Sequence, residues 1–222
     1  MRKSLTLFAL LAATLFSVST AIITHAAAPA DKVPFTLDRN YYQLIEPQPV
    51  TTGDKIEVME LFWYGCPHCY SLEPYLEKWL KSKPENVEFV RVPAIWSRKT
   101  WEFHARVYYT FEALGVLDKL HHEFFDELHK RKNRIRSLET LFPFLEKQGV
   151  DKKQFMDAYD SFAVDSKVRH SKLVSEKSGA DAVPTIVVDG KYRATASSAG
   201  GHEQLTLLID YLVALAAKER KK

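Results

Sequence analysis

Residues 56–69 read Ile56-Glu57-Val58-Met59-Glu60-Leu61-Phe62-Trp63-Tyr64-Gly65-Cys66-Pro67-His68-Cys69. Up to Phe62 this is a mostly apolar run of strand length, rich in residues that favour β structure. Residues 70–76 then continue with a sequence that predicts a helix. The two cysteines therefore stand where a strand passes into a helix, and the rest of the predicted fold is arranged around this junction.

Cys66 is placed at the predicted N-terminus of that helix. Unpaired backbone N–H groups and the positive end of the helix dipole stabilise an anion at such a position. A thiolate is an anion, so we expect Cys66 to be a nucleophile with a lowered pKa, with room for a partner chain beside Gly65. Cys69 lies one turn further along, where we expect it to be buried and to resolve a mixed disulfide. The spacing predicts a thiol–disulfide exchange centre.

The chain contains only these two cysteines. A single pair that closes so small a loop removes little loop entropy, so stabilisation is a weak reason for it. Half of a zinc site is the other alternative, and it requires two more ligands. Histidines are available, but none of the following forms a second spaced pair of ligand type: His68, His104, His121, His122 and His129. Redox chemistry is the better explanation, with no metal and no cofactor beyond the disulfide itself.

Pro67 and His68 separate the two sulfurs. An imidazole beside Cys66 would stabilise the thiolate of the reduced protein. Each pKa unit below the ambient pH favours the reduced form by about 1.4 kcal/mol, or roughly 30 mV for a two-electron couple. A strongly lowered pKa therefore makes the protein an oxidant. The alternative is that His68 is a solvated loop residue.

Two further positions stand out near strands. Glu60 is a charged residue inside an apolar strand and could accept a proton during thiol chemistry if it is buried. The alternation of residues along this strand does not settle which face is buried. Pro184, in Val183-Pro184-Thr185, introduces a later strand and marks an edge or a special turn. A lone X-Pro bond is trans by default, so the sequence by itself predicts trans.

The N-terminus has the pattern of a secretory signal peptide, with cleavage predicted after Ala26. An uncleaved anchor is the alternative, and both place the domain outside the cytoplasm. Residues 1–26 contain two basic residues and no acidic ones, which leaves 29 basic against 28 acidic residues. This near-neutral balance gives no argument for nucleic acid as a partner.

The remaining pattern is strand–helix–strand, then helices only, then an Asp189-Gly190 hairpin and a final helix. We therefore predict an α/β fold in which a sheet domain carries a helical insertion. The predicted parts are a signal peptide at 1–26, a sheet domain at 27–96 and 180–222, and an inserted helical domain at 97–179. The basic run 130–136 is read as a solvated helix end or loop.

The motif residues together resemble one known family. Residues 62–70, the Val183-Pro184-Thr185 segment and Asp189-Gly190-Lys191-Tyr192 are similar to those of the DsbA family of bacterial periplasmic thiol:disulfide oxidases. The resemblance covers essentially the whole mature chain, and the Cys-Pro-His-Cys choice is far more specific than a bare Cys-x-x-Cys. It implies a thioredoxin-like fold with an inserted helical domain.

The resemblance also assigns roles to single residues. It implies that the Val183–Pro184 bond is cis and lies beside the disulfide, with Val183 and Thr185 contacting client chains. It implies that Glu60 is a buried acid near Cys69, partnered in some members by a lysine on the neighbouring strand. An ungapped count places Glu88 or a hydrophobic residue at that position.

The resulting prediction is an oxidase that donates its Cys66–Cys69 disulfide to reduced, newly exported polypeptides in the periplasm. By the same resemblance, a quinone-linked inner-membrane partner of the DsbB type re-oxidises it. The alternatives are a disulfide reductase or isomerase, and a periplasmic chaperone that binds unfolded chains. No appended dimerisation domain is visible, so we expect a monomer.

Overall fold

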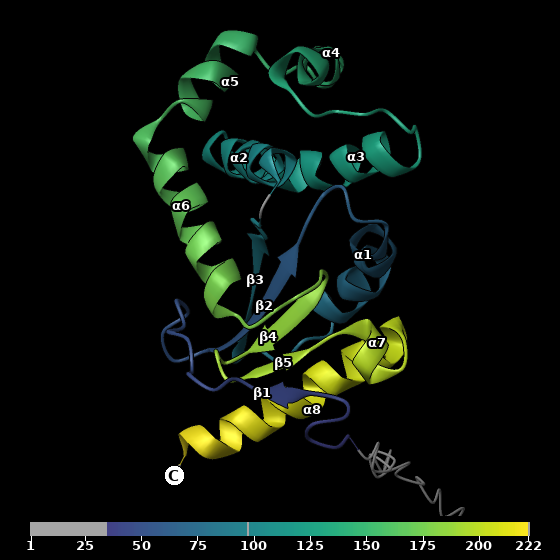
Figure 1. The fold of residues 1–222 in the computed structure, drawn as a ribbon, viewed down its shortest axis with the longest axis vertical. Coiled ribbons are helices and arrows are strands. Elements are labelled where there is room, and N and C mark those ends of the chain that lie inside the picture. Colours follow the sequence, from purple (N-terminus) through teal and green to yellow (C-terminus); the bar gives the residue numbers. More distant parts are fainter. Residues whose placement is uncertain (1–34, 97, 222) are drawn as a thin grey trace, which may run out of the picture. The chain divides into compact units, whose positions relative to one another are not determined.

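The structure, a computed structural model, describes residues 35–96 and 98–221. The predicted signal peptide lies outside these residues. Five strands form one mixed sheet in the order β1-β5-β4-β2-β3 (Figure 1). Their bounds are β1 Tyr42–Gln43, β2 Ile56–Phe62, β3 Val87–Pro93, β4 Thr185–Val188 and β5 Tyr192–Ala194.

Strand β2 lies between β3 and β4 and leads to the cysteines. It pairs in parallel with β3, from Ile56 opposite Val87 to Phe62 opposite Pro93. It pairs antiparallel with β4, where Val58 lies opposite Val188. All seven residues of β2 are buried. A strand covered on both faces carries no polar alternation, which is why the sequence could not decide which face Glu60 occupies.

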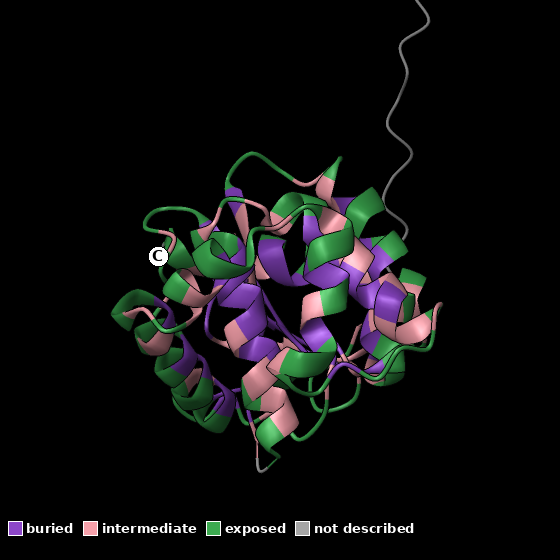
Figure 2. Cartoon of the chain, turned by 90° about the horizontal axis from the view of Figure 1, so that it is seen from above, coloured by how far each residue is buried: buried purple, intermediate pink, exposed green. Residues whose placement is uncertain are grey.

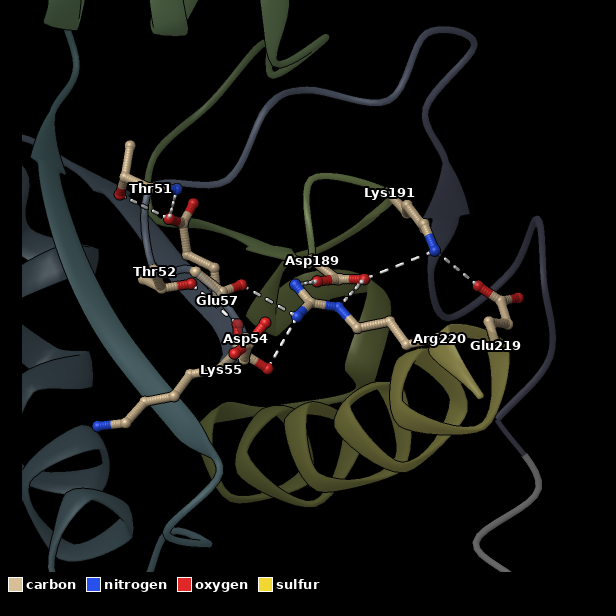
Figure 3. A network of polar contacts seen from close by, with 10 residues as sticks. Thr51, Thr52, Asp54, Lys55, Glu57, Asp189, Lys191, Glu219 and Arg220 are labelled. Carbon is tan, nitrogen blue, oxygen red and sulfur yellow. Dashed lines mark hydrogen bonds and ion pairs between the residues drawn. The ribbon is translucent and has the colours of Figure 1, made fainter. Parts of the chain in front are cut away.

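The β4–β5 hairpin turns at Asp189 and Gly190, as the sequence predicted. Both residues have positive φ, 54° and 63°, the backbone geometry that this turn requires. Helix α8, His202–Arg220, ends against the turn, and Figure 3 shows the contacts. Arg220 binds the Asp189 carboxylate and donates to the carbonyl of Asp54 at 2.9 Å. These contacts hold the last turn of the final helix, which ends at Arg220.

One face of the sheet is covered by α1, Pro67–Leu80, together with α8; the short α7, Ala196–Ala199, precedes α8. Side chains from both long helices share one buried cluster with the strands: Val58, Leu72, Leu76, Ile186, Val188, Leu205, Leu208 and Leu212. Strand β2, helix α1 and strand β3 thus form the predicted βαβ unit.

Five helices lie between β3 and β4 along the chain. They are α2 Lys99–Ala113, α3 Leu117–His129, α4 Leu138–Gln148, α5 Lys152–Tyr159 and α6 Phe162–Lys177. Phe62 and Tyr64, at and just beyond the end of β2, share a buried cluster with Phe111, Phe124 and Phe125 of α2 and α3. Figure 2 shows buried positions on the inward sides of the helices and exposed positions outside.

The core shared by these helices and the end of β2 places α2 and α3 against the cysteine motif. Pro143 lies inside α4 without ending it. The division at residues 97 and 179 stays a prediction. Within 35–96 and 98–221, the structure has no helix both long and apolar enough to cross a membrane.

Candidate active site

Cys66 is the N-cap residue of α1, and Pro67 is the first residue of the helix. Pro at this position loses no helical hydrogen bond, because its N–H would have no partner there. Cys66 is 8% exposed, whereas Cys69 is 0% exposed. Both cysteines are free, so the structure describes the dithiol form. Pro67 and His68 are exposed between them. An incoming thiol can therefore reach Cys66 but not Cys69.

The two thiols have opposite pKa shifts. Hydrogen bonding from the Cys69 thiol, followed by backbone N–H groups and the charge of His68, lowers the pKa of Cys66 to about 6 against the opposing effect of burial. Burial, together with the neighbouring Cys66, raises the pKa of Cys69 well above its ordinary value. These shifts favour Cys66 as the thiolate and Cys69 as the thiol.

The Val183–Pro184 bond is cis, so the trans default is wrong and the expectation from the family resemblance holds. Cys66 Sγ lies 3.4 Å from the carbonyl oxygen of Val183. The hydroxyl of Thr185 donates to Ala182 O at 2.8 Å, and Thr185 is only 1% exposed. Its side chain thus holds the turn before β4, while client contact by Val183 or Thr185 stays a prediction.

Gly65 serves the packing of Trp63. The Trp63 ring stacks on Trp101 of α2, with centroids 4.4 Å apart and planes at 8°. A Cβ added at Gly65 would lie 2.4 Å from the Trp63 ring. The space that the sequence suggested for a partner chain is therefore filled by this indole.

Tyr64 is attached to helix α3 through two histidines. His129 Nε2 donates to the backbone oxygen of Tyr64 at 2.7 Å, and the His129 ring stacks on Tyr70 at 5.0 Å. The Tyr64 hydroxyl lies 2.9 Å from His121 Nδ1. Sequence reasoning considered these histidines only as zinc ligands and missed this role. The usable signal was their spacing of eight residues, which places them on one face of a helix.

Glu60 is fully buried and faces Arg91 of β3. Arg91 Nε lies 3.3 Å from a Glu60 oxygen, an ion pair without an aligned hydrogen bond. Its guanidinium also donates to Glu73 of α1 at 2.9 Å. The expected neighbour, Glu88 or a hydrophobic residue, is wrong because the strand register aligns Glu60 with Arg91 and Glu88 with Glu57. An arginine thus occupies the place of the lysine in the family pattern.

The surroundings of Glu60 favour its protonated form. Burial and the charge of Glu73 raise the pKa of Glu60 to about 8, although Arg91 opposes this shift. Glu73 is also buried, yet its pKa stays below the ordinary value because His121 and Arg91 stabilise its charge. At neutral pH the pair therefore holds one proton, on Glu60. The charge of Glu60, when it is ionised, would raise the pKa of Cys69 further.

Replacing Glu60 with Gln should change how stability depends on pH. A carboxyl whose pKa rises from 4.5 to about 8 on folding contributes stability that is complete below pH 4.5 and lost as the pH rises through 8. The variant lacks this loss, so we expect it to be more stable than the wild type by about 1–3 kcal/mol at pH 9 and similar to it at pH 5. Urea unfolding of the disulfide forms measures the difference. Glu88→Gln, on the exposed side of β3, is the control, and parallel pH profiles for all three proteins would contradict the assignment.

Metal binding receives no support from the arrangement of ligands. Across the described residues, no group of three or more His, Cys, Asp or Glu side chains is placed to hold a metal ion. The zinc alternative would need two further ligands beside the cysteines.

Comparison with known proteins gives consistent matches. The family model of the DSBA-like thioredoxin domain matches residues 91–212. The thiol:disulfide interchange protein DsbA of Pseudomonas aeruginosa is 40% identical over 196 residues, 88% of this chain and 92% of that protein. The protein of the same name from Azotobacter vinelandii is 42% identical over 214 residues, 96% of this chain and 97% of that protein.

Solved structures agree with the sequence matches. The crystal structure of Pseudomonas aeruginosa DsbA superposes with a TM-score of 0.80 at 39% identity, covering 85% of this chain and 97% of that one. The oxidoreductase NmDsbA1 from N. meningitidis superposes with a TM-score of 0.76 at 28% identity, covering 86% of this chain and 99% of that one. The helix-start thiolate, the buried second thiol and the thioredoxin-like sheet with its helical segment agree with these matches. The chain belongs to the DsbA family and is a thiol:disulfide interchange oxidoreductase.

Proposed function

We propose that this protein is an oxidase, which donates the Cys66–Cys69 disulfide to newly exported polypeptides in the periplasm. The observation that supports this direction is the pKa contrast between the two thiols. A thiolate at Cys66, with its pKa near 6, stabilises the reduced protein relative to the disulfide. The disulfide therefore tends to accept two electrons and to leave the client oxidised.

The reaction is a sequence of two exchanges. A client thiolate attacks Cys66 Sγ, the bond to Cys69 breaks, and a mixed disulfide forms. A second client thiolate then attacks the client sulfur of that mixed disulfide, and Cys66 departs as a thiolate. Two electrons pass from the client to the protein, and the client gains a disulfide.

Two residues beside the sulfurs assist these steps. Cys69 leaves the first exchange as a buried thiolate, and the proton on Glu60 neutralises it. The backbone of Val183, whose oxygen lies 3.4 Å from Cys66 Sγ, then pairs with the client chain next to the reacting sulfur. Glu60 thus supplies a proton to the departing sulfur, and Val183 positions the client chain.

Continued turnover requires an acceptor for the two electrons. The family resemblance supports a quinone-linked inner-membrane partner of the DsbB type, and the signal-peptide pattern supports the periplasm.

A stoichiometric reaction tests the proposed direction. Oxidised protein is mixed with a reduced peptide that contains two cysteines. We expect one peptide disulfide to form for each Cys66–Cys69 disulfide consumed. Thiol labelling and mass spectrometry measure both quantities. A control peptide with one cysteine should stop at the mixed disulfide. Rearrangement of a mispaired client without net oxidation would favour the isomerase alternative, and reduction of an oxidised client would favour the reductase.

A further inference from the structure

The segment between α3 and α4, residues 130–136, is strongly basic. It reads Lys130-Arg131-Lys132-Asn133-Arg134-Ile135-Arg136, with five basic residues and no acidic one. We call it the basic loop. Neither the fold nor the proposed exchange reaction explains this concentration of charge.

Two hydrogen bonds fix the basic loop beside the cysteine motif. At its start, His129 donates to the backbone oxygen of Tyr64 at 2.7 Å. Near its end, His104 Nε2 donates to the backbone oxygen of Ile135 at 2.8 Å, and the His104 ring lies 5.8 Å from that of Trp63. Ile135 is 3% exposed, so it anchors the loop in the core. The loop is thus held against residues 63 and 64, immediately before Gly65 and Cys66.

Only part of the charge is neutralised by neighbouring acids. Lys130 lies 3.5 Å from Asp126, and Arg131 pairs with Glu123 and Glu127 of α3. The side chains of the remaining three cations are exposed and have no acidic partner within the described part of the chain: Lys132, Arg134 and Arg136. They leave three positive charges on the surface near the motif.

The backbone at Lys132 also argues against a purely structural loop. Lys132 has φ of 60°, a left-handed conformation that favours glycine. It follows the end of α3, where Asn133 N donates to Glu127 O at 3.0 Å, and such helix ends usually carry Gly or Asn. The turn alone therefore does not account for a lysine at this position.

We propose that the basic loop favours client polypeptides that carry acidic residues beside the reactive cysteine. This inference rests on the proposed oxidase function and names its preferred substrates. Charges within a Debye length of about 8–10 Å attract one another appreciably at physiological ionic strength. Positive charges on a loop held against residues 63 and 64, just before Cys66, raise the encounter rate with acidic segments of a client. Asp181, exposed two residues before Val183, is a single opposing charge on the other segment that lies near Cys66.

Single-turnover oxidation of three peptides tests the preference. The peptides share a two-cysteine core and differ only in flanking residues, which are Glu, Gln or Lys. For the wild type we expect the second-order rate constant to fall in the order Glu, Gln, Lys, with a roughly tenfold span at low salt that shrinks in 0.5 M salt.

The test variant combines Lys132→Gly, Arg134→Gln and Arg136→Gln. Glycine suits the left-handed backbone at position 132, so this variant should keep a melting temperature at or above that of the wild type. We expect this variant to oxidise the Gln peptide at the wild-type rate. The rate constants for the Glu and Lys peptides should differ by no more than about twofold.

A charge-matched control combines Lys172→Gln, Lys218→Gln and Lys221→Gln. These exposed lysines lie on α6 and at the end of α8, whereas the basic loop follows α3 (Figure 1). The control should keep the wild-type ranking.

Three outcomes overturn the inference. The first is an unchanged ranking in the loop variant, and the second is an equal loss in the control, which would indicate a net-charge effect. The third is loss of binding to phosphatidylglycerol vesicles with no change in peptide rates, which would assign the loop to a membrane surface. Failure to oxidise even the Gln peptide would remove the proposed function itself, whereas oxidation without ranking would remove only this inference.

Discussion

Replacing Cys66 with Ser should abolish client oxidation, with a loss of at least about 1000-fold in rate. A serine hydroxyl forms no disulfide, and the remaining thiol, Cys69, is 0% exposed with its pKa raised by burial. No second thiolate within reach of a client can take over the exchange. The measurement is the rate of disulfide formation in a reduced two-cysteine peptide, with the stoichiometric assay as readout.

Replacing Cys69 with Ser should give a different result, which makes it the matched control. Cys66 then remains a thiolate without its resolving partner. When the variant is given an oxidised client, the Cys66 thiolate should attack the client disulfide and release one client thiolate, and the resulting mixed disulfide should accumulate and be visible on a non-reducing gel. Equal trapping of mixed disulfides by the two serine variants would contradict the assignment of Cys66 as nucleophile.

The double replacement of both cysteines with Ala separates the oxidase from a chaperone. If that variant still suppresses client aggregation and restores function in cells, the chaperone alternative is favoured. We expect it to fail in cells, because disulfide donation needs both sulfurs.

The second large effect concerns the stability of the dithiol form. A thiol whose pKa falls from 9 to about 6 on folding contributes stability that is complete above pH 9 and is lost as the pH falls through 6. Between pH 5 and pH 8 we therefore expect the dithiol form to gain about 1–3 kcal/mol relative to the disulfide form, after allowance for solvent screening at the sulfur. This corresponds to roughly 20–60 mV of oxidising potential.

Urea unfolding of both redox forms across this pH range measures the gain. The disulfide form is the reference, because it shares the opposite pH dependence that Glu60 imposes. His68→Ala removes one of the groups that lower the Cys66 pKa. The dithiol form of this variant should therefore gain less stability between pH 5 and pH 8 than that of the wild type. A stability difference that does not vary with pH would contradict the thiolate assignment.

Much of the fold could be predicted from local sequence. The helix start at Cys66 and the Asp189-Gly190 turn are short-range features, fixed by a few neighbouring residues. The insertion was visible because five helices follow one another between β3 and β4 without strand-forming sequence. Local pattern determines such elements without reference to the rest of the chain.

The missed features depend on contacts between distant parts of the chain. Arg91 meets Glu60 only because the parallel register aligns residues 31 positions apart. His121 and His129 reach Tyr64 only because α3 packs over the end of β2. The prediction of a solvated loop at 130–136 was correct for its exposed side chains, but its place beside the motif follows from the His104 contact. Propensity and periodicity carry no information about these distances.

The pKa of Cys66 in the reduced protein is the quantity on which the oxidase proposal depends. It can be measured directly from the rate of alkylation of this thiol as a function of pH, with Cys69 protected by its burial. The proposal predicts a midpoint near pH 6. A midpoint near pH 9, the value of an unperturbed thiol, would mean that the reduced form gains nothing from the thiolate, and it would contradict the proposed direction of electron flow.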